Sequence, residues 1–285
     1  MATTSAAYNQ IIILQSLKIG HTGSRLFEDL NQIVRYAEGQ VSPKLVDVDS
    51  ETDLLKELDR IHASVITDGI VPLLHFETHG TDDKTGLVLA SDEFVPWATI
   101  KEPLTAINAA MRMNLFVCLS ACNGAGMTQI IQPTDRAPCW GMVGPISTMR
   151  AEELLRDYTA FYEELFKTKD GWAAIAKLNR GNIENGPYLF TTAEWFFRQV
   201  WRGYIHNYCS RPIYIDRANR MIRRLKMFGK PTRLSRNEMI EAMREHEKRF
   251  FDRAVTQYFM IDKYPEIASR VKIDYQDFLV EGSSQ

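Results

Sequence analysis

The sequence predicts an α/β fold: a mostly parallel sheet flanked by helices, followed by an α-helical C-terminal extension. Over the first two thirds of the chain, short apolar and β-branched runs alternate with segments of helical periodicity. Strands joined through helices run parallel in one sheet that is covered on both faces. After about residue 185 the alternation stops and the pattern becomes helical. We therefore expect one α/β domain over 1–185 and a regulatory or partner-binding extension over 186–285.

The individual elements follow from the spacing of apolar residues. Alternating or continuous apolar runs predict strands at 10–17, 44–48, 71–77, 86–91, 114–120 and 139–143. Apolar positions three and four residues apart predict helices at 25–38, 51–63, 97–111, 152–166 and 172–178. Ser24 and Ser50 precede two of these helices and are expected to cap them.

The composition is that of an ordinary soluble globular protein. The 285 residues are 45% hydrophobic and 25% charged, and no apolar run approaches the length of a membrane helix. The N-terminal apolar patch lacks a preceding basic residue and indicates a first strand rather than a signal peptide. The four cysteines show no CxxC spacing, so we expect reduced thiols and a cytoplasmic protein.

One segment is strongly basic. Between Trp201 and Arg236 the chain carries ten lysines and arginines but a single acid, Asp216. Such a basic run can bind nucleic acid or an acidic partner. We favour an amphipathic helix with its polar side in solvent, because basic residues recur at helical spacing beside apolar ones: Arg217, Arg220, Arg223 and Arg224 beside Met221, Leu225 and Phe228.

Two apolar runs end in residues that can take part in catalysis. "LLHFETHG" ends at His79 and Gly80. "NLFVCLSACNG" contains Cys122, which lies forty-three positions after His79. Adjacent parallel strands would bring both ends to one edge of the sheet, where α/β proteins place their sites. A thiol beside an imidazole suits nucleophilic catalysis, and a helix beginning after Asn123 would stabilise the thiolate. The backbone N–H groups of Gly80 and Cys122 would form an oxyanion hole.

These two motifs resemble those of a known family. "LHFETHG" and "LSACNG" are similar to the His-Gly and Ala-Cys motifs of caspase-like cysteine peptidases, especially the bacterial CHAT-type branch. The caspase signature reads Q-A-C-x-G with its histidine about 50 residues upstream; here Ser120 replaces the glutamine. "GMVGPIST" and the two helical segments after it extend the resemblance, which covers about 10–179.

The resemblance implies a caspase-like fold and a cysteine endopeptidase with a Cys122–His79 dyad. It implies no metal and no organic cofactor. It further implies a specific protein substrate, such as the product of a neighbouring gene, and activation by a protein or ligand in bacterial antiviral defence or stress signalling. We expect no membrane partner and no nucleic acid as the principal partner.

Four residues are candidates for the substrate pocket. Arg25 opens the first helix after "GHTGS", where a capped turn is an equally good interpretation. Glu77 lies on the strand that carries His79. Asp82 and Asp83 follow Gly80 in a segment typical of a hairpin turn, and would attract a basic substrate residue. Their charges oppose one another, so the sequence does not determine the cleavage preference.

Two readings from other classes stay open. His75, Glu77 and His79 share one face of a strand, so a metal hydrolase is conceivable, although we favour a hydrogen-bonded structural role for His75. The second is a catalytically silent scaffold whose basic helical region binds a protein or nucleic acid. We read Cys118, Cys139 and Cys209 as buried apolar residues.

Overall fold

The computed structural model describes residues 8–36, 41–183, 185–231 and 234–279. It divides into two compact units: unit 1 holds the residues up to Ile131 and Ala137–Ala193, and unit 2 holds Gln132–Arg136 and the residues from Glu194 onward. The elements of unit 1 are β1 (Gln10–Ser16), α1 (Thr22–Tyr36), β2 (Ser42–Asp47), α2 (Glu51–Thr67), β3 (Pro72–Gly80), β4 (Gly86–Val88), β5 (Phe94–Pro96), α3 (Trp97–Ala110), β6 (Phe116–Ser120), the 3₁₀ helix η1 (Gly124–Ile130), β7 (Gly141–Pro145), α4 (Ala151–Thr168), α5 (Gly171–Leu178) and β8 (Tyr188–Thr192).

The predicted α/β fold with a mostly parallel sheet is confirmed. Six strands pair in the order β2-β1-β3-β6-β7-β8, and every pair among the first five of them is parallel. The final pair, β7 with β8, is antiparallel, as are the short β4 and β5 that extend from β3. Glu77 of β3 lies beside Gln15 of β1 and Ser120 of β6, which fixes the register at the carboxyl ends of the strands.

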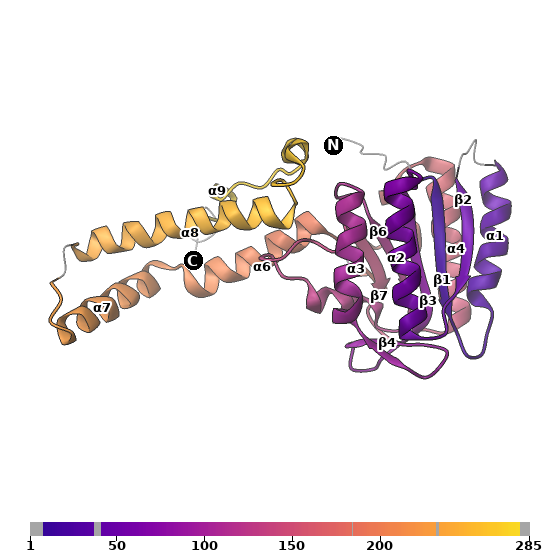
Figure 1. Ribbon diagram of the computed structural model, residues 1–285, viewed down its shortest axis with the longest axis horizontal. Coiled ribbons are helices and arrows are strands. Elements are labelled where there is room, and N and C mark those ends of the chain that lie inside the picture. The colour runs from indigo at the N-terminus through magenta and orange to yellow at the C-terminus, as the bar shows by residue number, and fades with distance from the viewer. Residues whose placement is uncertain (1–7, 37–40, 184, 232–233, 280–285) are drawn as a thin grey trace. The chain divides into compact units, whose positions relative to one another are not determined.

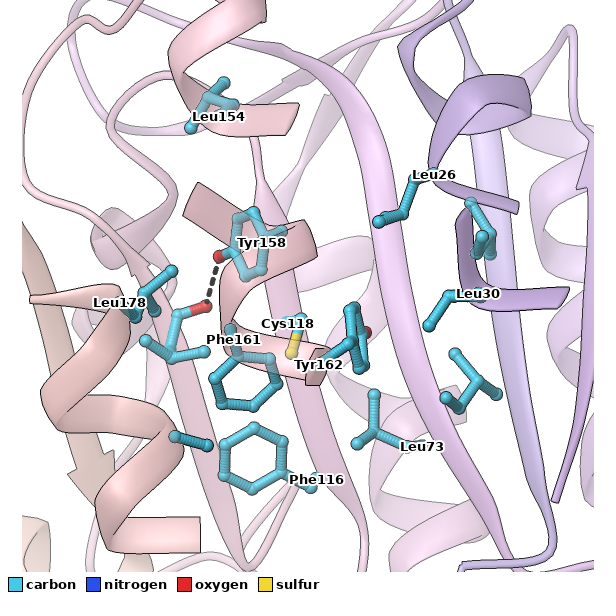
Figure 2. Close-up of a cluster of buried hydrophobic side chains, with 14 of the residues drawn as sticks. Leu26, Leu30, Leu73, Phe116, Cys118, Leu154, Tyr158, Phe161, Tyr162 and Leu178 are labelled. Atoms are coloured by element: carbon cyan, nitrogen blue, oxygen red, sulfur yellow. Dashed lines mark hydrogen bonds between the residues drawn. The ribbon is translucent and has the colours of Figure 1, made fainter. Parts of the chain in front are cut away.

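Helices cover both faces of this sheet (Figure 1). On one face α1 packs against α4 and α4 packs against α5, while α2 and α3 contact each other on the opposite face. The core beneath α1 and α4 is aromatic: Figure 2 shows Tyr158, Phe161 and Tyr162 of α4 facing Cys118 on β6. The Tyr158 hydroxyl donates to the carbonyl oxygens of Leu119 and Val143, so this buried phenol joins β6 to β7.

The end of unit 1 departs from the prediction. No strand was expected after residue 185, yet Tyr188–Thr192 forms β8 along the edge of the sheet. It runs antiparallel, only Tyr188 and Thr191 of its five residues are buried, and it ends in two threonines, so it lacks the continuous apolar run of a central strand. The domain boundary expected at residue 185 therefore lies before the last strand, whereas unit 1 continues to Ala193.

Unit 2 is helical, as expected for the C-terminal extension. Its elements are α6 (Ala193–Tyr208), which begins at the boundary, α7 (Arg211–Met227), α8 (Arg236–Tyr258), the 3₁₀ helix η2 (Pro265–Ser269) and α9 (Gln276–Leu279). Helices α7 and α8 form a hairpin whose core contains Tyr214, Ala218, Met239 and Ile240 (Figure 1). Within the described residues, no helix combines the length and apolarity needed to cross a bilayer.

Two predicted helix starts have different outcomes. Ser50 caps α2 as expected, because its side chain accepts a hydrogen bond from the Asp53 backbone N–H. Ser24 does not cap α1, which already begins at Thr22. The Ser24 N–H instead donates to the side-chain oxygen of Gln15 at 3.0 Å. The first turn of α1 is thus tied to the carboxyl end of β1.

Candidate active site

The His-Gly and Ala-Cys motifs lie at the same edge of the sheet. β3 and β6 are hydrogen-bonded parallel neighbours, with Glu77 of β3 opposite Ser120 of β6. His79 is the second residue after Glu77 and Cys122 the second after Ser120, so both leave the sheet at equivalent positions. His79 is exposed and Cys122 is half-buried. A substrate can therefore reach both side chains from solvent.

Gly80 is in direct contact with the backbone of Cys122. A Cβ atom placed on Gly80 would lie 1.7 Å from the Cys122 carbonyl oxygen and 3.2 Å from its amide nitrogen. No side chain fits into such a gap, because real Cβ atoms do not approach other atoms below about 3 Å. The glycine is thus required by close approach, and this approach holds the two motifs together.

The backbone N–H of Gly80 is directed toward Cys122. Antiparallel pairs alternate between hydrogen-bonded and non-hydrogen-bonded positions. The Thr81 N–H donates to the Gly86 carbonyl, so the next pair, Gly80 with Leu87, is of the non-hydrogen-bonded kind. β4 lies on the β1 side of β3, because the residue Ala90 that follows it donates to Ser16. The Gly80 N–H consequently points to the other side, where β6 and Cys122 lie.

Asn123 links the loop after β6 to the loops after β3 and β7 by hydrogen bonds. Its backbone is left-handed, with φ of 56°, a conformation that asparagine tolerates better than most residues. Its side-chain amide donates to the Thr81 carbonyl at 3.1 Å, and its backbone N–H donates to the Ser147 carbonyl at 3.2 Å. The loop after β6 is thereby joined to the loops after β3 and β7. The motif "ACNG" signalled this residue, but nothing in the sequence signalled its role.

Thiol and imidazole are not hydrogen-bonded to each other. The Cys122 thiol donates to the Met149 carbonyl at 3.5 Å, in the loop that leads from β7 to α4. In the part of the chain that the structure describes, the His79 side chain makes no hydrogen bond. The helix expected after Asn123 is the 3₁₀ helix η1 of seven residues. It is too short to contribute the thiolate stabilisation that was predicted from a helix dipole.

The other three thiols differ from Cys122 in their surroundings. Burial raises the pKa of Cys139 to about 12, and burial also raises the pKa of Cys118 far above that of a free thiol. Burial, together with the nearby Glu247 carboxylate, raises the pKa of Cys209 to about 12. These cysteines therefore stay protonated near neutral pH. Cys118 and Cys139 are buried as expected, whereas Cys209 is only partly buried.

His75 and Glu77 belong to a buried polar network. The Tyr162 hydroxyl lies 3.0 Å from His75 Nδ1, and His75 Nε2 lies 3.1 Å from the Glu77 carboxylate. The other Glu77 oxygen accepts from the Thr22 hydroxyl at 2.6 Å. Burial raises the Tyr162 pKa well above its usual value, so this phenol stays protonated. Its O–H donates a hydrogen bond to His75 Nδ1. Every polar group of the network is then satisfied.

The contacts in this network bear on the alternative that the protein is a metal hydrolase. His75 and Glu77 contact each other, but His79 lies exposed beyond the point where the helices cover the strand. Across the described residues no three histidine, cysteine, aspartate or glutamate side chains are placed to hold a metal ion. The structural role favoured for His75 agrees with these contacts, and the three residues named for a metal hydrolase do not form a site.

A row of polar side chains crosses the sheet beside the network. Asp47, Gln15, Glu77 and Ser120 are register partners on four adjacent strands. The Gln15 amide donates to Asp47 at 2.7 Å, whereas the hydroxyl of Ser120, a residue 1% exposed, has no hydrogen-bond partner among the described residues. Gln15 and Asp47 were not among the predicted site residues. The available signal was that both residues are polar and lie at the end of an otherwise apolar strand.

The four pocket candidates are not gathered together. Arg25 is exposed on α1 and forms an ion pair with Glu152 on α4, in which one guanidinium nitrogen donates to both carboxylate oxygens at 2.9 and 3.0 Å. Glu77 is 3% exposed, with both carboxylate oxygens occupied. Asp83 accepts from the backbone N–H and hydroxyl of Thr85, and these hydrogen bonds, with one from Thr81, hold its pKa below the usual range. Asp82 is exposed in the same turn.

Comparison of the chain with protein-family models and with curated proteins gives no match.

Proposed function

We propose that this protein is a cysteine endopeptidase in which Cys122 is the nucleophile and His79 the general acid and base. One observation carries the proposal: Gly80, adjacent to His79, packs directly on the backbone of Cys122 at the carboxyl edge of two paired strands. Close approach of backbone amides beside a half-exposed thiol is the arrangement that acyl transfer requires. The similarity of "LHFETHG" and "LSACNG" to caspase-like peptidases agrees with it.

The proposed reaction uses groups of this chain alone. His79 takes the thiol proton, and the Cys122 sulfur attacks the scissile carbonyl carbon. The N–H groups of Gly80 and Cys122 donate to the oxygen that becomes negative. His79 then gives its proton to the leaving amine, and an acyl-enzyme forms. Water attacks this thioester with His79 as base, the carboxylic acid departs and the thiol regains its proton.

The proposal requires one rearrangement. The thiol donates to the Met149 carbonyl, which cannot accept its proton, and must turn to the His79 imidazole before it is activated. Binding of substrate or of an activating partner at the loop from β7 to α4 would supply this change. We accordingly propose a peptidase that is held at rest, in keeping with the regulated bacterial defence or stress systems expected from the resemblance.

Thiol reactivity tests the dyad without knowledge of the substrate. The purified protein is treated with limiting iodoacetamide across pH 5 to 9, and adducts are located by mass spectrometry. We expect Cys122 to react first in the wild type, and its reactivity to shift to higher pH in His79→Ala. His21→Ala, which removes another exposed histidine, is the matched control and should leave the profile unchanged.

A catalytically silent scaffold is the second candidate, favoured by the absence of a hydrogen bond between the thiol and the imidazole. The two functions differ in a peptide-library digestion. A peptidase cleaves library peptides, and cleavage disappears in Cys122→Ala but persists in Cys209→Ala. A reactivity profile that is identical in wild type and His79→Ala, together with no cleavage in the presence of candidate partners, would establish the scaffold instead.

A further inference from the structure

The C-terminal end of α7 exposes apolar side chains. The predicted amphipathic helix is present, but its apolar side is only partly covered: Met221 is 49% exposed and Phe228 is 62% exposed. Together with Leu225 they line a groove of about 360 Å³, whose remaining lining residues are Arg224 and Lys230. We refer to these five residues as the hairpin-end groove. An exposed apolar cluster of this kind commonly marks an interaction site.

Among the apolar residues of this groove, the hairpin core uses only Leu225. Packing of α7 on α8 buries Tyr214, Ala218, Met239 and Ile240, with Leu225 partly buried against them. Met221 and Phe228 are absent from that cluster. Their exposure is therefore not a by-product of the contact that holds the two helices together, and replacing them leaves that contact in place.

The cationic residues of the groove lack counterions. Asp216 is the single acid between Trp201 and Arg236, and it pairs with Arg220 at 2.9 Å. No carboxylate of the described residues forms an ion pair with Arg224 or Lys230. Positive charge without a partner surrounds an apolar surface, so the surface is complementary to a ligand that is both acidic and apolar.

We propose that the hairpin-end groove binds a segment of a partner protein that combines acidic and apolar side chains on one face. Its apolar side chains would contact Met221, Leu225 and Phe228, and its carboxylates would pair with Arg224 and Lys230. A flexible methionine beside a phenylalanine suits apolar side chains of different shapes. This inference does not depend on peptidase activity, since none of its residues belongs to the candidate active site.

The composition of the groove favours a protein over a nucleic acid. Nucleic acid binds through phosphates and through bases that stack on flat side chains. Of the three apolar lining residues, Met221 and Leu225 are aliphatic and offer no stacking surface. Phosphates would engage the arginines along the whole helix and would not need the groove. Dependence on Met221 and Phe228 therefore separates the two kinds of partner.

Peptide selection on the full-length protein tests the proposal. A phage-displayed library of random peptides is selected on Cys122→Ala protein, which cannot cleave it, and is counter-selected on the double variant Met221→Ser/Phe228→Ser. We expect enriched peptides in which aspartate or glutamate alternates with leucine, isoleucine or phenylalanine. Their dissociation constants are then measured by fluorescence polarisation with synthetic peptides.

Matched variants on the same helix decide the outcome. Met221→Ser/Phe228→Ser and Arg224→Glu/Lys230→Glu should each weaken binding at least about tenfold. Met227→Ser removes a side chain that is 76% exposed but lies outside the groove, and Arg223→Glu makes a charge change outside it; both should retain wild-type affinity. Circular dichroism confirms that each variant is folded.

Three results would overturn the proposal. The first is a selection in which no peptide depends on Met221 and Phe228. The second is equal loss of binding in the control variants. The third is an oligothymidylate that binds as tightly as the peptides and is insensitive to Met221→Ser/Phe228→Ser, which would identify a nucleic-acid surface instead.

Discussion

Glu77 shows how a single side chain can be placed on the correct face of a strand and still serve another purpose. Alternation along β3 predicted that His75, Glu77 and His79 share a face, and the contact between the first two agrees with it. Sequence alternation does not reveal where α1 and α4 stop covering that face. Thr22 and Tyr162 close over His75 and Glu77, and His79 emerges beyond them.

Glu77→Ala should therefore act on stability. The change leaves the His75 Nε2–H and the Thr22 hydroxyl buried without an acceptor. Unsatisfied buried donors of this kind cost about 2 to 4 kcal/mol in the free energy of unfolding. Urea unfolding followed by tryptophan fluorescence measures it. Asp82→Ala, in an exposed turn, is the control and should stay within about 0.5 kcal/mol of wild type. A loss that is no larger for Glu77→Ala than for Asp82→Ala contradicts the assignment.

At the scale of elements, the paired strands β3 and β6 do most to arrange the candidate site. Their parallel pairing was predictable, because continuous apolar runs belong in the centre of a mostly parallel sheet. β8 was not predictable in the same way. Tyr188–Thr192 is a five-residue antiparallel edge strand with only two buried residues, Tyr188 and Thr191, and its place depends on β7 rather than on any pattern within itself.

Gly80→Ala tests the contact between the two strand ends. A methyl group would collide with the Cys122 carbonyl oxygen, so the loop must shift and the proposed oxyanion donors separate. We expect a loss of about 1 to 3 kcal/mol in stability and loss of any peptidase activity. Gly203→Ala is the matched control: nothing lies within 4 Å of its Cβ, and alanine inside α6 should add about 0.5 to 1 kcal/mol. Full activity in Gly80→Ala would show that this contact is dispensable.

An ion pair within unit 2 gives a pH-dependent prediction. Arg136 holds Asp262 in a bidentate pair, with N–O distances of 2.8 and 2.6 Å, and lowers the pKa of that carboxyl. A lowered pKa stabilises the fold above the ordinary carboxyl value, and the stabilisation is lost as pH falls through the lowered one. Because Asp262 is partly exposed, Asp262→Asn should cost only about 0.5 to 1 kcal/mol at pH 7.

Urea unfolding measured over a series of pH values tests this ion pair. Urea midpoints of wild type and Asp262→Asn should differ from neutral pH down to about pH 4 and converge only at lower pH. Asp216→Asn breaks the more exposed pair with Arg220 and should change neither the midpoint nor its pH dependence. A constant difference between wild type and Asp262→Asn down to pH 2 would rule out the pair as its cause.

For the whole molecule, the distribution of chemistry between the two units is uneven. Unit 1 contains the paired strand ends, the buried network and the half-exposed thiol. Unit 2 contains the basic helix and the hairpin-end groove. The charge run was evident in the sequence, and so was the amphipathic spacing. The exposure of Met221 and Phe228 was not, because it depends on how far α8 extends along α7.

The molecule as a whole should behave as a protein with one reactive thiol. Burial places the pKa of Cys139 and of Cys209 at about 12 and that of Cys118 higher still. At pH 9, three units below 12, roughly a thousandth of such a thiol is ionised, and the fraction falls tenfold with each further unit. Titration with Ellman's reagent at pH 8 should release one equivalent in the native protein and four in guanidinium chloride. More than one native equivalent contradicts the raised pKa values of these three thiols.

The contact at Gly80 also has a consequence for evolution. While the loop after β6 keeps its position, residue 80 is closed to every amino acid that carries a Cβ. A lineage that retains Cys122 as a nucleophile can therefore vary the rest of the strand end but not this glycine. Among descendants of the same ancestor, replacement of Gly80 would precede or accompany loss of the thiol. Under the proposed function, a residue with a Cβ at position 80 would mark copies that have lost peptidase activity.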